Sequence, residues 1–127
     1  ARHHLLNQLQ EGTTTLGGSG AHHLNLVHLD DIVSAVMGCL KTSETIGSQI
    51  FNVVDTDPAR REEVVQWLAE RLERKMPAFD GIPGTRRGGE PMPDRIISSE
   101  KIQRVLGWRP QYPDYRSGFE EILAKKG

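Results

Sequence analysis

The 127-residue chain has little of three things: cysteine, net charge and long apolar runs. Its single cysteine, Cys39, excludes a disulfide within the chain and is typical of a reducing cytoplasm. Sixteen basic and seventeen acidic residues give a net charge of −1, which provides no overall field to attract nucleic acid or an anionic membrane. No apolar run approaches the roughly 18 residues that a membrane span needs. We therefore expect a soluble, cytoplasmic protein without nucleic-acid or membrane partners.

The strongest pattern lies in residues 25–40, which predict a strand followed by an amphipathic helix. Residues 25–29 are short and apolar, as in a strand. Asp30 is the expected N-cap, because its carboxylate can accept hydrogen bonds from the first backbone N–H groups of a helix. Apolar residues then recur at one-turn spacing, which predicts a helix face buried against a sheet. These residues are Ile32, Val33, Val36, Met37 and Leu40.

The remaining pattern predicts a single α/β domain over residues 1–127, with a small, mostly parallel three-stranded sheet flanked by about four helices. Residues 49–55 are apolar on both faces, as in strands of parallel sheets, so residues 25–55 predict a strand–helix–strand unit with a right-handed crossover. A third short strand is expected at 95–98. Further helices are expected at 3–11, 60–74, 98–106 and from Asp114 onward.

Residues 76–94 are interrupted by prolines and glycines and predict a long loop. Loops of this length inside a compact domain are usually functional or disordered. The loop carries the most ligand-like cluster of the chain, Arg86, Arg87 and Glu90. The planar donor fork of arginine matches phosphate, and a nearby carboxylate can accept hydrogen bonds from sugar hydroxyls. From the residues alone, a solvated charged loop is an equal alternative.

The other candidate residues favour structural roles. The histidines, as pairs at 3–4 and 22–23 and singly at His28, do not have the spacing of a zinc site, so no metal site is predicted. Residues 17–20 are glycine-rich but precede a strand, which favours a plain turn over a phosphate-binding loop. Asn25 and His28 mark the two ends of the central strand, and His28 favours a hydrogen bond to a neighbouring loop over a catalytic role. No complete catalytic motif is present, and no catalytic residue is predicted.

Three segments together resemble the C-terminal part of NAD-dependent epimerase/dehydratase proteins, in the extended or atypical branch of the short-chain dehydrogenase/reductase superfamily. They are Asn-Leu-Val-His-Leu-Asp-Asp-Ile at 25–32, Gln-Ile-Phe-Asn-Val-Val-Asp at 49–55, and 97–119 with its Leu-Gly-Trp-Arg-Pro run. Their order and spacing also agree, and the resemblance spans nearly the whole chain.

This resemblance implies a truncated chain that corresponds to the substrate-binding lobe of such a protein. In the family, an N-terminal Rossmann lobe holds NAD(P) and a catalytic Tyr-x-x-x-Lys pair, while the smaller lobe closes over a nucleotide sugar or a related substrate. The chain contains neither that pair nor a Gly-x-x-Gly-x-x-Gly motif. We therefore expect that it binds no cofactor alone and is not catalytically complete.

The resemblance also implies site residues. Arg87 and Glu90 stand where family epimerases carry an Arg-x-Gly-Asp that grips the nucleotide. Arg86 and Arg87 are expected to contact phosphate, Glu90 a hydroxyl, and Asn25 and His28 the wall of the pocket. Leu24 stands where epimerases often carry an arginine that reaches the diphosphate, so another substrate is plausible.

An alternative is a stand-alone interaction module. The face that would dock onto a Rossmann lobe would otherwise be an exposed apolar patch, which favours self-association, for example as a dimer.

Overall fold

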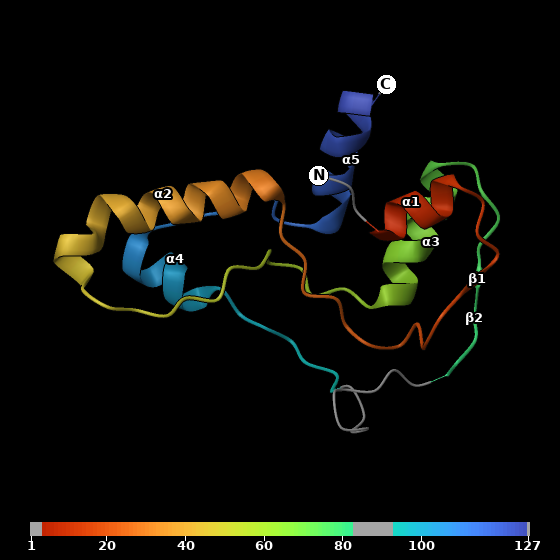
Figure 1. Ribbon diagram of the computed structural model, residues 1–127, viewed down its shortest axis with the longest axis horizontal. Helices are drawn as coiled ribbons and strands as arrows, with labels where there is room; N and C mark the ends of the chain where they lie inside the picture. The colour runs from red at the N-terminus through yellow and green to blue at the C-terminus, as the bar shows by residue number, and fades with distance from the viewer. Residues whose placement is uncertain (1–3, 83–92, 127) are drawn as a thin grey trace. The chain divides into compact units, whose positions relative to one another are not determined.

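The computed structural model describes residues 4–82 and 93–126. In these ranges the order of elements is α1 (His4–Gln10), β1 (Thr15–Leu16), α2 (Leu29–Ile46), α3 (Arg61–Arg71), β2 (Ala78–Phe79), α4 (Glu100–Leu106) and α5 (Tyr115–Lys126) (Figure 1). The predicted α/β class is confirmed. None of the helices in the described ranges is both long and apolar enough to cross a membrane.

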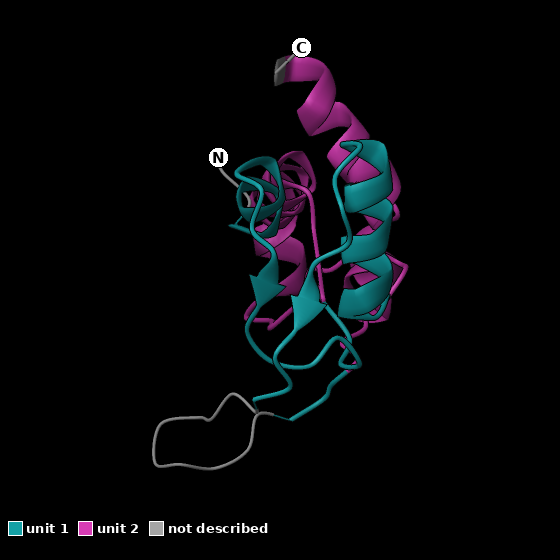
Figure 2. Cartoon of the chain, turned by 90° about the vertical axis from the view of Figure 1, so that its right-hand side faces the viewer, with its two compact units in different colours: residues 1–24, 59–95 teal, residues 25–58, 96–127 magenta. Residues whose placement is uncertain are grey.

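The chain divides into two compact units (Figure 2). Unit 1 comprises residues 1–24 and 59–95, and unit 2 comprises residues 25–58 and 96–127. Each unit contains segments that are far apart in the sequence. The single domain predicted from the sequence therefore stays a prediction.

Unit 1 is built on two helices and a short parallel sheet. Helices α1 and α3 pack together and bury leucines, valines and an alanine: Leu5, Leu6, Leu9, Val64, Val65, Leu68 and Ala69. Strand β1 pairs in parallel with β2, so that Thr15 lies opposite Ala78 and Leu16 opposite Phe79. A Cβ at Gly20 would lie 2.8 Å from the ring of Phe79, so the packing beside β2 admits only glycine at this position.

Unit 2 has its own core, in which α2 packs against α4. Ala35, Ile102 and Trp108 are buried at its centre, and partly buried apolar side chains surround them: Phe51, Val53 and Leu106. Helix α4 ends, as predicted, at Gly107, whose positive φ of 66° suits glycine. The Oδ1 atom of Asp114 accepts a hydrogen bond from the Ser117 N–H at 2.8 Å, which confirms Asp114 as the cap of α5.

The predicted three-stranded sheet is not confirmed, because the sheet in the described residues has two strands. The segments 25–29, 49–55 and 95–98, each predicted as a strand, have no strand assignment. Among the described residues, the backbone groups of 50–54 form no hydrogen bond with another backbone group. A strand needs such a partner, and apolar alternation alone does not provide one. Strand β2 lies instead within the segment predicted as a loop.

Helix α2 corrects two predictions. The helix begins at Leu29, and His28, rather than Asp30, is its N-cap, with Nδ1 accepting a hydrogen bond from the Asp30 N–H at 3.0 Å. The apolar face predicted to be buried is exposed, at 39% to 66% for Ile32, Val33, Val36, Met37 and Leu40. The helix buries Asp31 and Ala35 instead. The described residues of unit 2 do not cover the predicted face, and Cys39 beside it is partly buried.

Candidate functional site

Asn25 and His28 lie in unit 2 and are both engaged by protein groups. The Oδ1 atom of Asn25 accepts a hydrogen bond from the Ile97 N–H at 2.8 Å, which joins this residue to the segment before α4. The side chain of His28 is 5% exposed, and its ring stacks on Tyr112 with the centroids 4.1 Å apart.

Both ring nitrogens of His28 have partners. Because Nδ1 accepts the Asp30 N–H, the ring proton is on Nε2, which donates to Glu121 Oε2 at 2.6 Å. The Lys125 ammonium, 2.6 Å from the other oxygen of Glu121, lowers the pKa of this carboxyl, and His28 adds to the effect. His28 therefore joins the start of α2 to α5. Among the described residues, His28, Asp30 and Glu121 are the cluster with the spacing of metal ligands, but these contacts already occupy the histidine.

Asp31 holds the residues directly after the Leu-Gly-Trp-Arg-Pro run of the family resemblance against α2. Its carboxylate is 2% exposed and accepts hydrogen bonds from the N–H groups of Gln111 at 2.7 Å and Tyr112 at 3.0 Å. The indole N–H of Trp108 donates to Ser34 Oγ at 2.9 Å on the same helix. No role of Asp31 was predicted from the sequence, so this one was missed.

Arg86, Arg87 and Glu90 lie outside the described residues, but their flanking residues are described and belong to unit 1. The Oδ1 atom of Asp80 accepts hydrogen bonds from the N–H groups of Gly18 and Ile82, each at 2.8 Å. The Oδ1 atom of Asp94 accepts the His23 N–H at 2.8 Å and lies 3.1 Å from His23 Nδ1. These backbone hydrogen bonds lower the pKa of both aspartates. The flanks on both sides of 83–92 therefore bind the same stretch, 18–23.

The glycine-rich stretch 17–20 is a bend, as predicted, and does not begin a helix. Its Gly18 N–H points to the Asp80 carboxylate, and the Arg61 guanidinium donates to the Gly17 carbonyl at 2.6 Å. An amide that already donates to a carboxylate does not fit a bound pyrophosphate, which needs free N–H groups at a helix N-terminus. Within the described ranges, this stretch does not provide a dinucleotide site.

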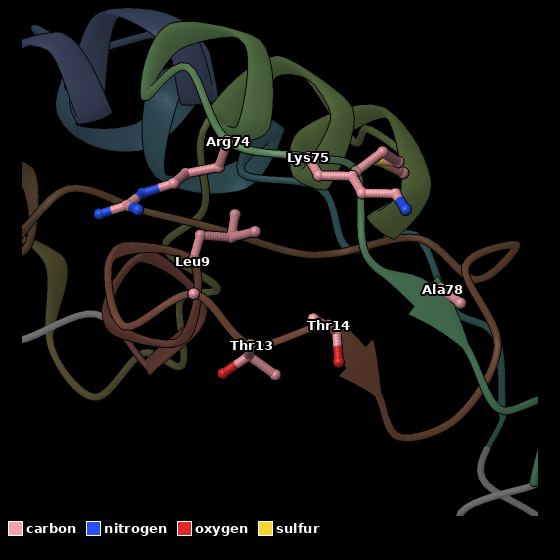
Figure 3. A pocket seen from close by; sticks show the side chains of 8 residues that line it. Leu9, Thr13, Thr14, Arg74, Lys75 and Ala78 are labelled. Atoms are coloured by element: carbon pink, nitrogen blue, oxygen red, sulfur yellow. The ribbon is translucent and has the colours of Figure 1, made fainter.

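A cavity in unit 1 was not predicted from the sequence. It has a volume of about 340 Å³ and lies beside the end of α1 and the start of β2 (Figure 3). Leu9 forms part of its apolar wall, and Thr13, Thr14 and Lys75 add polar groups. The Arg74 guanidinium at its edge donates to the Gln10 carbonyl at 3.1 Å.

Two further cavities lie in unit 2. An apolar groove of about 290 Å³ follows the exposed face of α2, where Ile32, Val36 and Leu40 meet Phe51 and Val53. A second cavity, of about 280 Å³, lies between Asp55 and the start of α4. The pKa of the Asp55 carboxyl is raised from 3.8 to about 7, mainly by burial; the hydrogen bond from the Asp57 N–H opposes this rise, and neighbouring carboxylates contribute to it. Sequence patterns do not indicate either cavity.

Several solved structures contain a part with this fold. The UDP-glucuronic acid 4-epimerase of Bacillus cereus matches 98% of the chain with a TM-score of 0.73 and 20% identity, and the match covers 40% of that enzyme. The dTDP-glucose 4,6-dehydratase of Bacillus anthracis matches 94% of the chain with a TM-score of 0.68 and 20% identity, over 36% of its length. The fold is therefore that of a part of such epimerases and dehydratases.

Sequence comparison extends this likeness to homology. The UDP-glucose 4-epimerase of Corynebacterium glutamicum is 33% identical over 98 residues, which are 77% of this chain and 29% of that enzyme. Protein YeeZ of Escherichia coli is 30% identical over 95 residues, or 75% of this chain and 32% of that protein. No model of a protein family matches the chain. The chain is homologous to a part of these proteins, which confirms the resemblance to the NAD-dependent epimerase/dehydratase family, and it spans about a third of the length of these curated relatives.

Proposed function

We propose that this chain is the substrate-binding part of an NAD(P)-dependent epimerase/dehydratase-type protein and takes a nucleotide sugar or a similar phosphorylated small molecule. The observation that supports this most is the 33% identity to a UDP-glucose 4-epimerase over 98 residues. A Rossmann lobe would bind NAD(P) and supply the proton-donating Tyr-x-x-x-Lys pair, because the sequence contains neither that pair nor a Gly-x-x-Gly-x-x-Gly motif. The chain alone would then bind substrate without transferring hydride.

In this proposal Arg86 and Arg87 contact phosphate and Glu90 a hydroxyl group. The attachment of the flanking residues Asp80 and Asp94 to 18–23 supports it, since the chain enters and leaves 83–92 at fixed points of unit 1. Asn25 and His28 would contribute to the wall of the pocket. The contacts of His28 favour a positioning role, because both of its nitrogens already have protein partners.

Replacing Arg87 by alanine is expected to weaken nucleotide-sugar binding about tenfold or more, because a charge-assisted hydrogen bond to phosphate is lost. Isothermal titration of UDP-glucose, UDP-glucuronic acid and dTDP-glucose into the chain measures this. Arg104→Ala, at an exposed position on α4, removes the same charge and should leave binding unchanged. Failure of all three ligands to bind, or equal binding by Arg87→Ala, contradicts the proposal.

A second candidate function is an interaction module, and the exposed apolar face of α2 favours it. Soluble monomers rarely expose contiguous apolar patches of this kind. We propose that this face docks onto a Rossmann lobe in a complete enzyme, and that the isolated chain covers it by self-association. Among the described residues, the backbone of 50–54, beside the groove along α2, forms no hydrogen bond with another backbone group, which supports the same docking surface.

Val36→Glu is expected to weaken self-association at least about tenfold, because burying a charge in place of an apolar side chain is costly. Sedimentation velocity over a wide range of concentrations measures the association. Ile82→Glu places the same charge at an exposed apolar residue of unit 1 and should not change it. A wild-type chain that stays monomeric at every concentration argues against the interaction module.

A further inference from the structure

The cavity beside Asp55 has the composition of a binding site that neither proposed function uses. It has a volume of about 280 Å³ and lies entirely within unit 2. Pro58 and Ile97 give it apolar walls, and Asp55, Ser99 and Gln103 give it polar groups. Apolar walls with a few convergent polar groups are typical of small-ligand sites.

In this cavity, the Asp55 carboxyl group has an oxygen to which none of the described residues donates a hydrogen bond. The residue is only 8% exposed, and its Oδ1 atom accepts a hydrogen bond from the Asp57 N–H at 3.1 Å. Its other oxygen, Oδ2, has no hydrogen-bond partner among the residues that the structure describes. An ionised carboxylate can accept about four hydrogen bonds, and burying one without partners is costly. A ligand with N–H donors would satisfy Oδ2.

Acidic residues surround Asp55, and they come from several different elements. Asp57 follows it in the chain, Asp31 comes from α2 and Asp114 precedes α5, and each raises the pKa of Asp55. Glu100 of α4 lines the same cavity, and none of the basic side chains that the structure describes does so. The ion pair of Asp57 with Arg116 has 3.7 Å between nitrogen and oxygen and joins two largely exposed side chains. The cavity therefore favours positive charge.

The hydroxyl and amide groups of the cavity are mostly engaged with each other. The Gln103 Nε2 group donates to Ser99 Oγ at 2.9 Å, and the Glu100 N–H donates to Ser98 Oγ at 3.1 Å. Asp55 Oδ2 is thus left as the acceptor for an incoming donor. Within the described ranges, the residues with metal-ligand spacing are in another place, at His28, Asp30 and Glu121.

We propose that this cavity binds the head group of an organic cation, an ammonium or a guanidinium, which donates hydrogen bonds to Asp55 Oδ2. Guanidinium is the more weakly hydrated of the two and can engage a carboxylate with two parallel N–H bonds. The cation belongs either to a free amine or to a lysine or arginine side chain of a polypeptide. The chemistry of recognition is the same for both sources.

Titration of methylammonium and methylguanidinium, followed by the backbone amide NMR signals of Asp57 and Glu100, tests the proposal. Saturable shifts are expected at about pH 8, with about tenfold weaker apparent affinity at about pH 6, because only the ionised carboxyl binds the cation and its pKa is about 7. This pH comparison needs no substitution. A peptide with an internal arginine that binds as tightly as methylguanidinium assigns the site to a polypeptide side chain, whereas binding of the small cation alone assigns it to a free amine.

Two controls make the test specific. Asp55→Asn should bind the cations at least about tenfold more weakly, because the amide is neutral. Glu44→Gln makes the same change of charge at an exposed position of α2 and should bind like the wild type. Absence of saturable shifts at the higher pH, unchanged binding by Asp55→Asn, or equal shifts with neutral glucose would overturn the proposal.

Discussion

Asp31→Ala is expected to lower the free energy of unfolding by about 2–4 kcal/mol, because two partly buried N–H groups lose their acceptor. These groups, on Gln111 and Tyr112, attach the segment after Trp108 to α2. Urea denaturation followed by tryptophan fluorescence measures the change, since Trp108 lies beside the affected contacts and donates to Ser34.

The neighbouring Asp30 provides the control. Its side chain is exposed and forms no comparable pair of hydrogen bonds to a distant segment, so Asp30→Ala should change the stability by less than about 1 kcal/mol. Asp31→Asn retains one acceptor oxygen and should fall between the wild type and Asp31→Ala. Equal effects of the alanine substitutions at positions 30 and 31 would contradict the role assigned to Asp31.

The second large effect is expected from Asp55→Asn, as a change in how stability depends on pH. The folded state raises the pKa of this carboxyl from 3.8 to about 7 and so holds the proton more tightly than the unfolded chain. The contribution of Asp55 is therefore complete below about pH 4 and is lost as the pH rises to about 7. Because one pKa unit corresponds to about 1.4 kcal/mol, the loss is at most about 4 kcal/mol, and screening by solvent reduces it.

Urea denaturation of wild type and Asp55→Asn at a series of pH values isolates this contribution. Asp80, Asp94 and Glu121 have lowered pKa values and act with the opposite sign, stabilising the fold above their unfolded pKa values and losing this effect as the pH falls. Their contributions are common to both proteins and cancel in the difference. Relative to the wild type, the variant should gain stability as the pH rises from about 4 to about 7. Parallel pH profiles would contradict the buried, proton-holding state of Asp55.

The sequence predicted the helices well, because a helix satisfies most of its backbone hydrogen bonds within one segment. The periodicity predicted all the helices of the described ranges, and Gly107 and Asp114 marked ends that the structure confirms. The strands failed for the complementary reason. Residues 49–55 have the right apolar pattern, but a strand also needs backbone hydrogen bonds to a neighbour, and among the described residues the backbone of 50–54 forms none with another backbone group.

The sequence also predicted the candidate site only in part. His28 was expected to form a hydrogen bond to a neighbouring loop; its ring bonds the start of α2 and Glu121 of α5 instead, and its place in a pocket wall stays a prediction. Arg86, Arg87 and Glu90 lie outside the described ranges, so their roles also stay predictions. Asp31 and Asp55 were missed because no local pattern distinguishes an exposed aspartate from a buried one. Their burial depends on segments that are remote in the sequence.

The backbone at 50–54 also bears on how the isolated chain behaves. Among the described residues this segment forms no backbone–backbone hydrogen bond, although the Ile50 carbonyl accepts one from Lys101 Nζ at 2.9 Å. An extended apolar segment of this kind is a template on which further copies can add, which is how edge strands start aggregation. Ile50, at 85% exposure, adds a large apolar side chain at this edge. Concentrated solutions of the chain alone are therefore expected to precipitate or form fibrils, and a lysine in place of Ile50 would act as a gatekeeper against this.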